Sequence, residues 1–226
     1  MSITTYKEFE WRLPKAGNGE SGVRLTNLFL DLVKGLENVK TICDLGCGNG
    51  YMAGLLAELG YDVVGVDASE SGIAIARQNF AKAEFVHSSI DSTLRDKTML
   101  DDFDLVVSSD VIEHFYRPSD LIEAAVSLLK PNGHLLVGTP YHGYLKNLAL
   151  SVTAKMDAHF TTLNDGGHIK FFSVRTLSQL LRSYHFTNLN FTFYGRAPWL
   201  WKNMICHARS LGPQDVRTDH AFNSYL

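Results

Sequence analysis

Short apolar segments alternate with helical segments along most of this chain, and this alternation limits the folds that the chain can adopt. The apolar runs KTICDLG, DVVGVD, AEFVHS, FDLVVSSD and GHLLVGTP each have the length and composition of a buried strand. Segments with helical periodicity, such as YMAGLLAEL and LIEAAVSLL, separate them. The pattern predicts a doubly wound α/β fold with a mostly parallel sheet.

Further elements are predicted on both sides of this alternation. Residues 21–37 carry apolar residues on one helical face, and Ser69 and Ser71 offer N-caps to a helix running through IAIARQNF. Towards the C-terminus, SVRTLSQLLRSYH predicts a helix and TNLNFTFYG predicts a strand. The periodicity of NMICHAR is compatible with a strand or with a short helix.

The alternation breaks after Pro140, where residues 141–168 intervene before the next predicted helix. This insertion contains one apolar stripe at helical spacing, made by Leu145, Leu148, Ala149, Val152 and Met156. We expect part of it to be an amphipathic helix and the whole insertion to act as a substrate lid. A single domain is expected over residues 1–210, followed by a C-terminal tail at 211–226.

Composition and charge exclude several classes of protein. The 226 residues are 45% hydrophobic, which is enough for one sizeable core, and the net charge of −3 provides no basic field for nucleic acid. The N-terminal sequence lacks the apolar run of a secretory signal, and no stretch approaches the roughly 20 apolar residues of a membrane span. Cys43, Cys47 and Cys206 form no CxxC pair. We expect a reduced, cytoplasmic protein.

The segment DLGCGNG, residues 44–50, follows the first predicted strand, and its glycines indicate close approach to a ligand. It lacks the Gly-Lys-Ser/Thr ending of a P-loop, and Tyr51 stands where a dinucleotide fingerprint has its last glycine. Asp44 would repel a pyrophosphate but suits a cationic amine. Asp67, at the end of the second strand, can accept both ribose hydroxyls. S-adenosylmethionine has a ribose, an ammonium group and no phosphate, and therefore fits.

The segments ICDLGCGNG, VVGVDASE, FDLVVSSDVIEH and LLKPNGHLLVGTP resemble successive motifs of the class I S-adenosylmethionine-dependent methyltransferases. The resemblance covers roughly residues 38–140 and implies a Rossmann-like sheet of seven strands with a final antiparallel hairpin, which favours a strand for NMICHAR. Relatives often carry an acid where Ser89 stands. The resemblance also implies cofactor contacts at Asp44, Gly46, Cys47, Gly48, Asp67 and Ala68, adenine near Ser89 and Ile90, and Ser109 at the mouth of the fourth strand.

Within this class, EH after the fourth strand, TP after the fifth and the segment GGHIKFFSVRTLSQLL resemble the ubiquinone-biosynthesis O-methyltransferase group. This resemblance implies O-methylation of a small hydroxylated molecule, with S-adenosylhomocysteine as the product. It supports the reaction type better than any particular acceptor.

A hydroxyl acceptor needs a base near neutral pH, and histidine, with an ordinary pKa of about 6.5, is the usual choice. Four of the nine histidines fall beyond the carboxyl ends of the strands, where ligands bind in this fold class: His114, His142, His159 and His168. Each can instead line the crevice or cap a helix. We favour His168 and His114 as candidate bases, with His142 as the third choice.

A divalent metal is an alternative to an unaided base. Asp110, Glu113 and His114 have the i, i+3, i+4 spacing that places side chains on one face of a helical turn. With His168 they would resemble the metal site of RNA 3′-end 2′-O-methyltransferases. We do not favour the metal, because a six-coordinate hard ion requires several oxygens and this set offers two carboxylates.

Two further features have more than one interpretation. Arg24 can pair with the carboxylate of the methionine moiety or form a surface salt bridge. The segment APWLWKN places Trp199 and Trp201 beside Lys202, which suits peripheral contact with a membrane, although core packing or a dimer contact is the better interpretation.

We therefore predict an S-adenosylmethionine-dependent O-methyltransferase of a small molecule. RNA 2′-O-methylation is the second hypothesis, disfavoured because the chain has no basic stripe with aromatic residues. The third is a non-catalytic, cofactor-binding partner of another subunit. The crevice histidines argue against it.

Overall fold

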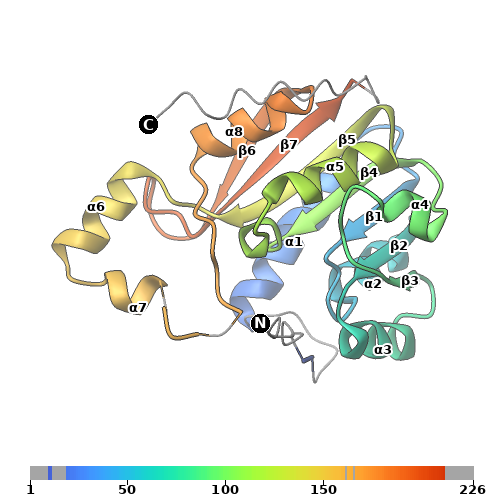
Figure 1. The fold of residues 1–226 in the computed structure, drawn as a ribbon, viewed down its shortest axis with the longest axis horizontal. Helices are drawn as coiled ribbons and strands as arrows, with labels where there is room; N and C mark the ends of the chain where they lie inside the picture. Colours follow the sequence, from blue (N-terminus) through green and yellow to red (C-terminus); the bar gives the residue numbers. More distant parts are fainter. Residues whose placement is uncertain (1–9, 12–18, 161, 165, 212–226) are drawn as a thin grey trace, which may run out of the picture.

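The computed structural model describes residues 10–11, 19–160, 162–164 and 166–211, which form one seven-stranded sheet flanked by helices (Figure 1). The strands are β1 (Thr41–Leu45), β2 (Asp62–Asp67), β3 (Glu84–His87), β4 (Phe103–Ser109), β5 (Leu129–Pro140), β6 (Phe186–Tyr194) and β7 (Asn203–Ser210). Their order is β3-β2-β1-β4-β5-β7-β6, with β7 antiparallel to both of its neighbours and the other pairs parallel. The doubly wound fold, the final antiparallel hairpin and the strand at NMICHAR are confirmed.

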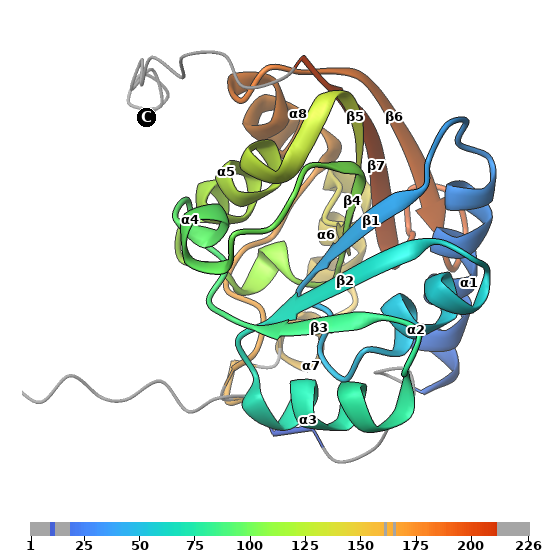
Figure 2. The same ribbon diagram turned by 90° about the vertical axis from the view of Figure 1, so that its right-hand side faces the viewer.

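The central strands are apolar on both faces because helices cover both. Adjacent residues of β1 therefore point to opposite faces of the sheet. Ile42 belongs to the hydrophobic core on one face, and Cys43 belongs to the core on the other. Figure 2 shows the two groups of helices on opposite faces. One group consists of α1 (Glu20–Lys34), α2 (Tyr51–Glu58) and α3 (Glu70–Asn79), and the other of α4 (Leu94–Thr98), α5 (Pro118–Leu128) and α8 (Val174–Ser183).

Side-chain caps define where two of these helices begin. The Ser69 hydroxyl accepts a hydrogen bond from the Gly72 N–H at 3.1 Å, which confirms Ser69 as the N-cap of α3. Ser173 and Thr176 form a reciprocal capping box at the start of α8. These caps fix the ends of the helices that border the ligand-binding edge of the sheet.

The insertion contains two helices, α6 (Tyr144–Val152) and α7 (Met156–Phe160), which project from the body of the domain (Figure 1). The apolar stripe predicted for it faces solvent: 49% of Leu145 and 78% of Val152 are exposed. The buried residues of α6 are Lys146 and Leu150, which come from the other side of the helix. The helical period was therefore correct, but the prediction that the stripe extends in one helix to Met156 was wrong, because α6 ends at Val152.

Two short elements were not predicted. Both α4 and the 3₁₀ turn η1 (Ile112–His114) are too short to show a hydrophobic period in the sequence. Within the described residues, no helix has both the length and the apolar character that crossing a bilayer requires. Of the predicted C-terminal tail, residues 212–226 lie outside the described part of the chain.

Candidate active site

The glycine loop joins β1 to α2 at the carboxyl end of the parallel strands. Gly46 and Gly48 have φ angles of 82° and 55°, a region that residues with a side chain rarely adopt. A Cβ on Gly46 would lie 2.4 Å from a Val111 methyl group, and one on Gly48 would lie 2.4 Å from the Trp11 ring. The loop therefore needs glycine for its conformation and for its close packing under neighbouring segments.

Asp44 lies just before this loop and is 1% exposed. Neither of its carboxylate oxygens has a hydrogen-bond partner among the described residues. Burial, and secondarily the negative charge of Asp67, raises the pKa of Asp44 to about 8. The Ala53 N–H opposes this shift without reaching hydrogen-bond geometry. A buried, unpaired carboxylate of this kind is stabilised when a cation binds beside it.

Asp67, at the end of β2, is held in place by two backbone groups. Its Oδ2 accepts a hydrogen bond from the Gly48 N–H at 2.7 Å, and its Oδ1 accepts one from the Ser69 N–H at 2.7 Å. The glycine loop also pairs directly with β2, because the Gly46 and Cys47 N–H groups donate to the Val66 carbonyl. Asp67 thus lies beside the loop, and the cofactor contacts of Asp67 and Ala68 stay a prediction.

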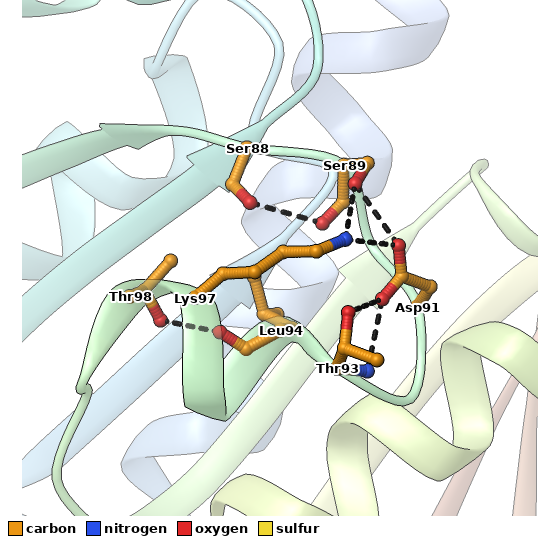
Figure 3. A network of polar contacts seen from close by, with 7 residues as sticks. All are labelled: Ser88, Ser89, Asp91, Thr93, Leu94, Lys97 and Thr98. Atoms are coloured by element: carbon orange, nitrogen blue, oxygen red, sulfur yellow. Dashed lines mark hydrogen bonds and ion pairs between the residues drawn. The ribbon is translucent and has the colours of Figure 1, made fainter.

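Ser89 and Ile90 follow β3 at the same edge of the sheet, and Figure 3 shows the polar network around Ser89. The Ser89 hydroxyl donates to Asp91 Oδ2 at 3.0 Å, and Lys97 Nζ donates to the same oxygen at 2.7 Å. Thr93 donates to the other oxygen through its N–H and its hydroxyl. The Lys97 hydrogen bond, with those from Thr93 and Ser89, holds the pKa of Asp91 well below its usual range. Sequence reasoning did not consider Asp91, an acid two residues after Ser89 that is hydrogen-bonded to it.

Arg24 and Ser109 occupy different surroundings. The Arg24 side chain is 70% exposed on α1 and its Nη2 lies 4.0 Å from Glu20 Oε2. Arg24 therefore forms the surface salt bridge that was one of its two interpretations. The other, contact with the carboxylate of the methionine moiety, stays a prediction. Ser109 ends β4 and is half-buried next to the loop that leads into η1.

Glu113, His114 and His168 come together at the centre of this edge. Glu113 Oε1 lies 3.8 Å from His168 Nε2, and the His114 and His168 rings meet edge to face with centroids 4.9 Å apart. The Glu113 side chain is fully buried, and Oε1 has no hydrogen-bond partner among the described residues. Within this trio, each residue offers a ligand atom and these atoms all lie within 4.8 Å of one another. The trio can therefore hold a proton or a metal ion.

Glu113 is the point where three segments meet. Its Oε2 accepts a hydrogen bond from the Thr139 hydroxyl of β5 at 3.0 Å. Its backbone carbonyl accepts hydrogen bonds from the N–H groups of Ile169 and Lys170, at 3.0 and 2.9 Å. These contacts join the EH, TP and GGHIK segments and place His168 beside the carboxylate.

Asp110 does not join the trio, so the predicted four-residue metal site is wrong in this respect. Its φ angle is 55°, in the left-handed region, so the chain is not helical there and i, i+3 spacing does not apply. Asp110 Oδ1 instead accepts a hydrogen bond from Asn203 Nδ2 of β7 at 2.6 Å. Burial raises the pKa of Asp110 to about 7.

The electrostatics favour neutral imidazoles at this site. Burial raises the pKa of Glu113 well above its ordinary value, with a further contribution from Asp110. Burial lowers the pKa of His114, and burial together with His114 lowers that of His168 to about 4. The expectation of a base near pKa 6.5 was therefore wrong for His168, because partial burial among other cationic groups disfavours its protonated form. A neutral imidazole is the form that accepts a proton.

The other two crevice histidines form a separate cluster. His142 is buried after β5, and its ring lies 5.3 Å from the ring of His159, 5.8 Å from Phe160 and 5.0 Å from Phe171, between centroids. Burial lowers the pKa of His142 to about 4. His159 contributes to the lowered pKa of His168, so the two clusters are electrostatically connected.

The two tryptophans of the β6–β7 connection differ in burial. Trp201 stacks on Phe193 with centroids 4.1 Å apart and meets Tyr141 edge to face, which confirms core packing for this residue. Trp199 is 60% exposed. Membrane contact through Trp199 stays a prediction.

Comparison with known proteins is consistent with this geometry. Residues 22–190 match a family model described as "Methyltransferase domain". Among curated relatives, ubiquinone biosynthesis O-methyltransferases from Hydrogenovibrio crunogenus and Photobacterium profundum are 27% and 28% identical, over 73% and 76% of this chain and 71% and 78% of those proteins. The mitochondrial ubiquinone biosynthesis O-methyltransferase of Schizosaccharomyces pombe is 29% identical over 63% of this chain, and the match spans about half, 53%, of that protein.

Solved structures share the fold. Magnesium protoporphyrin IX methyltransferase from Synechocystis PCC 6803, with bound S-adenosylhomocysteine, superposes with a TM-score of 0.62 at 20% identity, over 83% of this chain and 82% of that one. An S-adenosylmethionine-dependent methyltransferase from Methanosarcina mazei gives a TM-score of 0.61 at 22% identity, over 81% and 98% of the two chains.

Proposed function

The chain belongs to the methyltransferase-domain family, and from this premise we propose that it is an S-adenosylmethionine-dependent O-methyltransferase of a small hydroxylated acceptor. The observation that carries the proposal is Asp44, whose buried carboxylate lacks a hydrogen-bond partner among the described residues and lies beside the glycine loop. An ammonium group placed there would compensate the buried charge. The names of the curated relatives support oxygen as the atom that receives the methyl group.

The residues at the edge of the sheet fit the parts of this cofactor. Asp44 suits its ammonium group, Asp67 its ribose hydroxyls, and Ser89 and Ile90 its adenine. Gly46 and Gly48 add no side chain of their own to the ligand-binding loop, and Cys47 and Ala68 complete the expected set of cofactor contacts. When bound, S-adenosylmethionine supplies a methyl group that is already activated by a sulfonium. The protein must therefore position the acceptor and remove its proton.

The histidine–glutamate trio can perform that proton transfer. A neutral His168 or His114 imidazole accepts the proton of the acceptor hydroxyl as the oxygen becomes nucleophilic. Glu113 Oε1 lies 3.8 Å from His168 Nε2, and in its ionised form this carboxylate stabilises the positive charge that the ring acquires. The absence of Asp110 from the trio removes an oxygen ligand, which favours the base over a hard divalent ion.

Asp67→Ala should weaken S-adenosylmethionine and S-adenosylhomocysteine binding by about 1.5–3 kcal/mol, because it removes a charge-assisted hydrogen bond to ribose. Isothermal titration calorimetry measures this difference. Asp62→Ala is the matched control, since Asp62 is an exposed residue at the other end of the same strand. NAD should not bind the wild type. Unchanged affinity in the Asp67 variant, or tight NAD binding, contradicts the proposed ligand.

We also propose that residues 141–168 act as a lid over the acceptor. α7 buries none of its residues, and an open hollow of about 580 Å³ is lined by Asp157, Thr162, Leu163 and Asn164. Amide hydrogen exchange in this insertion should be fast in the free protein and slow once cofactor and acceptor are present. Mass spectrometry of peptides from 141–168, with β4 as the protected reference, tests this. Protection equal to that of β4 in the free protein argues against a lid.

A further inference from the structure

Lys146 is a buried cation in a part of the site that the proposed chemistry does not use. It lies on the inner side of α6, is 3% exposed, and donates a hydrogen bond to the Tyr141 carbonyl at 2.6 Å. No carboxylate among the described residues lies within 4.0 Å of its ammonium group. Burying an ammonium without a counter-charge costs several kcal/mol, so its retention here calls for an anionic partner.

The surroundings of Lys146 add positive charge and unsatisfied polar atoms. Burial, and secondarily Arg196 of the β6–β7 connection, lowers the pKa of Lys146 to about 8. His142 Nδ1 and Asn147 Oδ1 are buried without hydrogen-bond partners among the described residues. Asn147 nevertheless raises the pKa of His142, which places their side chains near each other. A ligand that binds beside Lys146 would therefore need negative charge and hydrogen-bonding capacity.

Aromatic rings lie beside these polar groups, and the charge of Lys146 acts on His168. Phe160 and Phe171 meet edge to face with centroids 4.8 Å apart, and the His142 ring contacts both. Lys146 and His159 both lower the pKa of His168, so their charges act on the same crevice. One molecule can thus place an anionic group at Lys146, an apolar body on the phenylalanines and a hydroxyl at His168.

We propose that Lys146, assisted by Arg196, binds a carboxylate of the methyl acceptor, which makes the acceptor a hydroxylated carboxylic acid. This inference rests on the proposed O-methyltransferase function. A carboxylate matches Lys146 better than a phosphate dianion does, because Lys146 is the single buried lysine or arginine among the described residues and Arg196 is exposed.

The test compares hydroxylated acids with their uncharged primary amides, using caffeate with caffeamide and 3-hydroxybenzoate with 3-hydroxybenzamide. Calorimetry in the presence of S-adenosylhomocysteine measures binding, and methyl transfer is measured separately. The wild type should bind at least one acid about 10–100-fold more tightly than its amide. Lys146→Met should abolish that preference, and Lys146→Arg should retain part of it. Lys155→Met, at an exposed lysine of the same insertion, should leave it unchanged.

The outcomes separate this inference from the proposed function. If no acid binds more tightly than its amide, or if the preference survives in Lys146→Met, the carboxylate site is wrong. Methylation of neutral acceptors would then still support the O-methyltransferase. If an acid binds in a Lys146-dependent manner but no hydroxyl is methylated with any acceptor, the carboxylate site stands and the proposed function fails. Thermal unfolding of each variant confirms that it is folded.

Discussion

His168→Ala is expected to lower kcat by about 10²-fold or more while S-adenosylhomocysteine affinity stays unchanged. The substitution removes the imidazole that lies 3.8 Å from Glu113 Oε1 and leaves the glycine loop untouched. His114→Ala, which removes the neighbouring ring, should have an effect of the same order. Methyl transfer to an accepted acceptor measures kcat, and calorimetry measures the affinity. His185→Asn is the control, because His185 is exposed and its φ of 61° suits asparagine.

Chelation distinguishes a base from a metal at the same trio. If an imidazole takes the proton unaided, dialysis against EDTA should leave turnover unchanged. Loss of activity on chelation, with recovery on adding Mg²⁺, Mn²⁺ or Zn²⁺, would make the general-base assignment wrong. Glu113, His114 and His168 would then be the metal ligands, since their ligand atoms lie within 4.8 Å of one another. This test must use a true acceptor, because a catechol can bridge a metal through two oxygens.

Asp44→Ala is expected to weaken S-adenosylmethionine binding by about 2–5 kcal/mol, the largest effect on affinity that we predict. The carboxylate is buried and has no protein hydrogen bond among the described residues, so the ligand's ammonium group would be its main partner. Calorimetry with S-adenosylhomocysteine, which carries the same ammonium group, measures the loss. An affinity within twofold of the wild type would show that the ammonium does not bind at Asp44.

The raised pKa of Asp44 gives this binding a definite dependence on pH. Because the pKa is about 8 in the free protein and the cation favours the ionised form, binding at pH 6–7 releases a proton. Affinity should therefore fall with decreasing pH below about 8, by about tenfold per pH unit at most. Titrations in two buffers with different ionisation enthalpies report the released proton directly. Asp44→Asn should abolish both the release and this pH dependence.

The same shift predicts how the stability of the free protein changes with pH. The folded state holds the Asp44 proton between its ordinary pKa of 3.8 and about 8, whereas the unfolded state releases it at the lower value. The contribution of Asp44 to the free energy of unfolding therefore decreases as pH rises through this range. Chemical unfolding at pH 5 and pH 8 measures this effect in the wild type and in Asp44→Asn. Between pH 5 and pH 8 the free energy of unfolding should fall less in Asp44→Asn than in the wild type.

Most of the fold could be predicted because its elements carry strong local signals. The segment DVVGVD coincides with β2, and Ser69 caps α3 as its position suggested. Asp44 was proposed as a cofactor residue because it lies near the end of a strand just before the glycine loop, and Asp67 because it ends the next strand 23 residues later. These residues are set by interactions within a short stretch of chain, which a sequence displays directly.

The features that sequence reasoning missed depend on contacts between distant segments. Asp110 leaves the expected helical face because its backbone is left-handed and its carboxylate accepts a hydrogen bond from Asn203 on β7. The stripe on α6 was recognised as apolar, but a helical period does not reveal whether another element covers that side. Lys146 carried no signal because a single lysine in a helix is ordinarily a solvated residue.

The two ends of the insertion are fastened at one place, and this bears on how acceptor range can evolve. The His142 N–H donates to the Phe172 carbonyl at 2.9 Å, and Ile169 and Lys170 are bonded to Glu113. The chain between these anchors is a closed loop. The free energy of closing such a loop changes only slightly when residues are added or removed. Residues 144–164 can therefore be exchanged between relatives as a cassette, which would alter selectivity for the acceptor while His168 remains fixed beside Glu113.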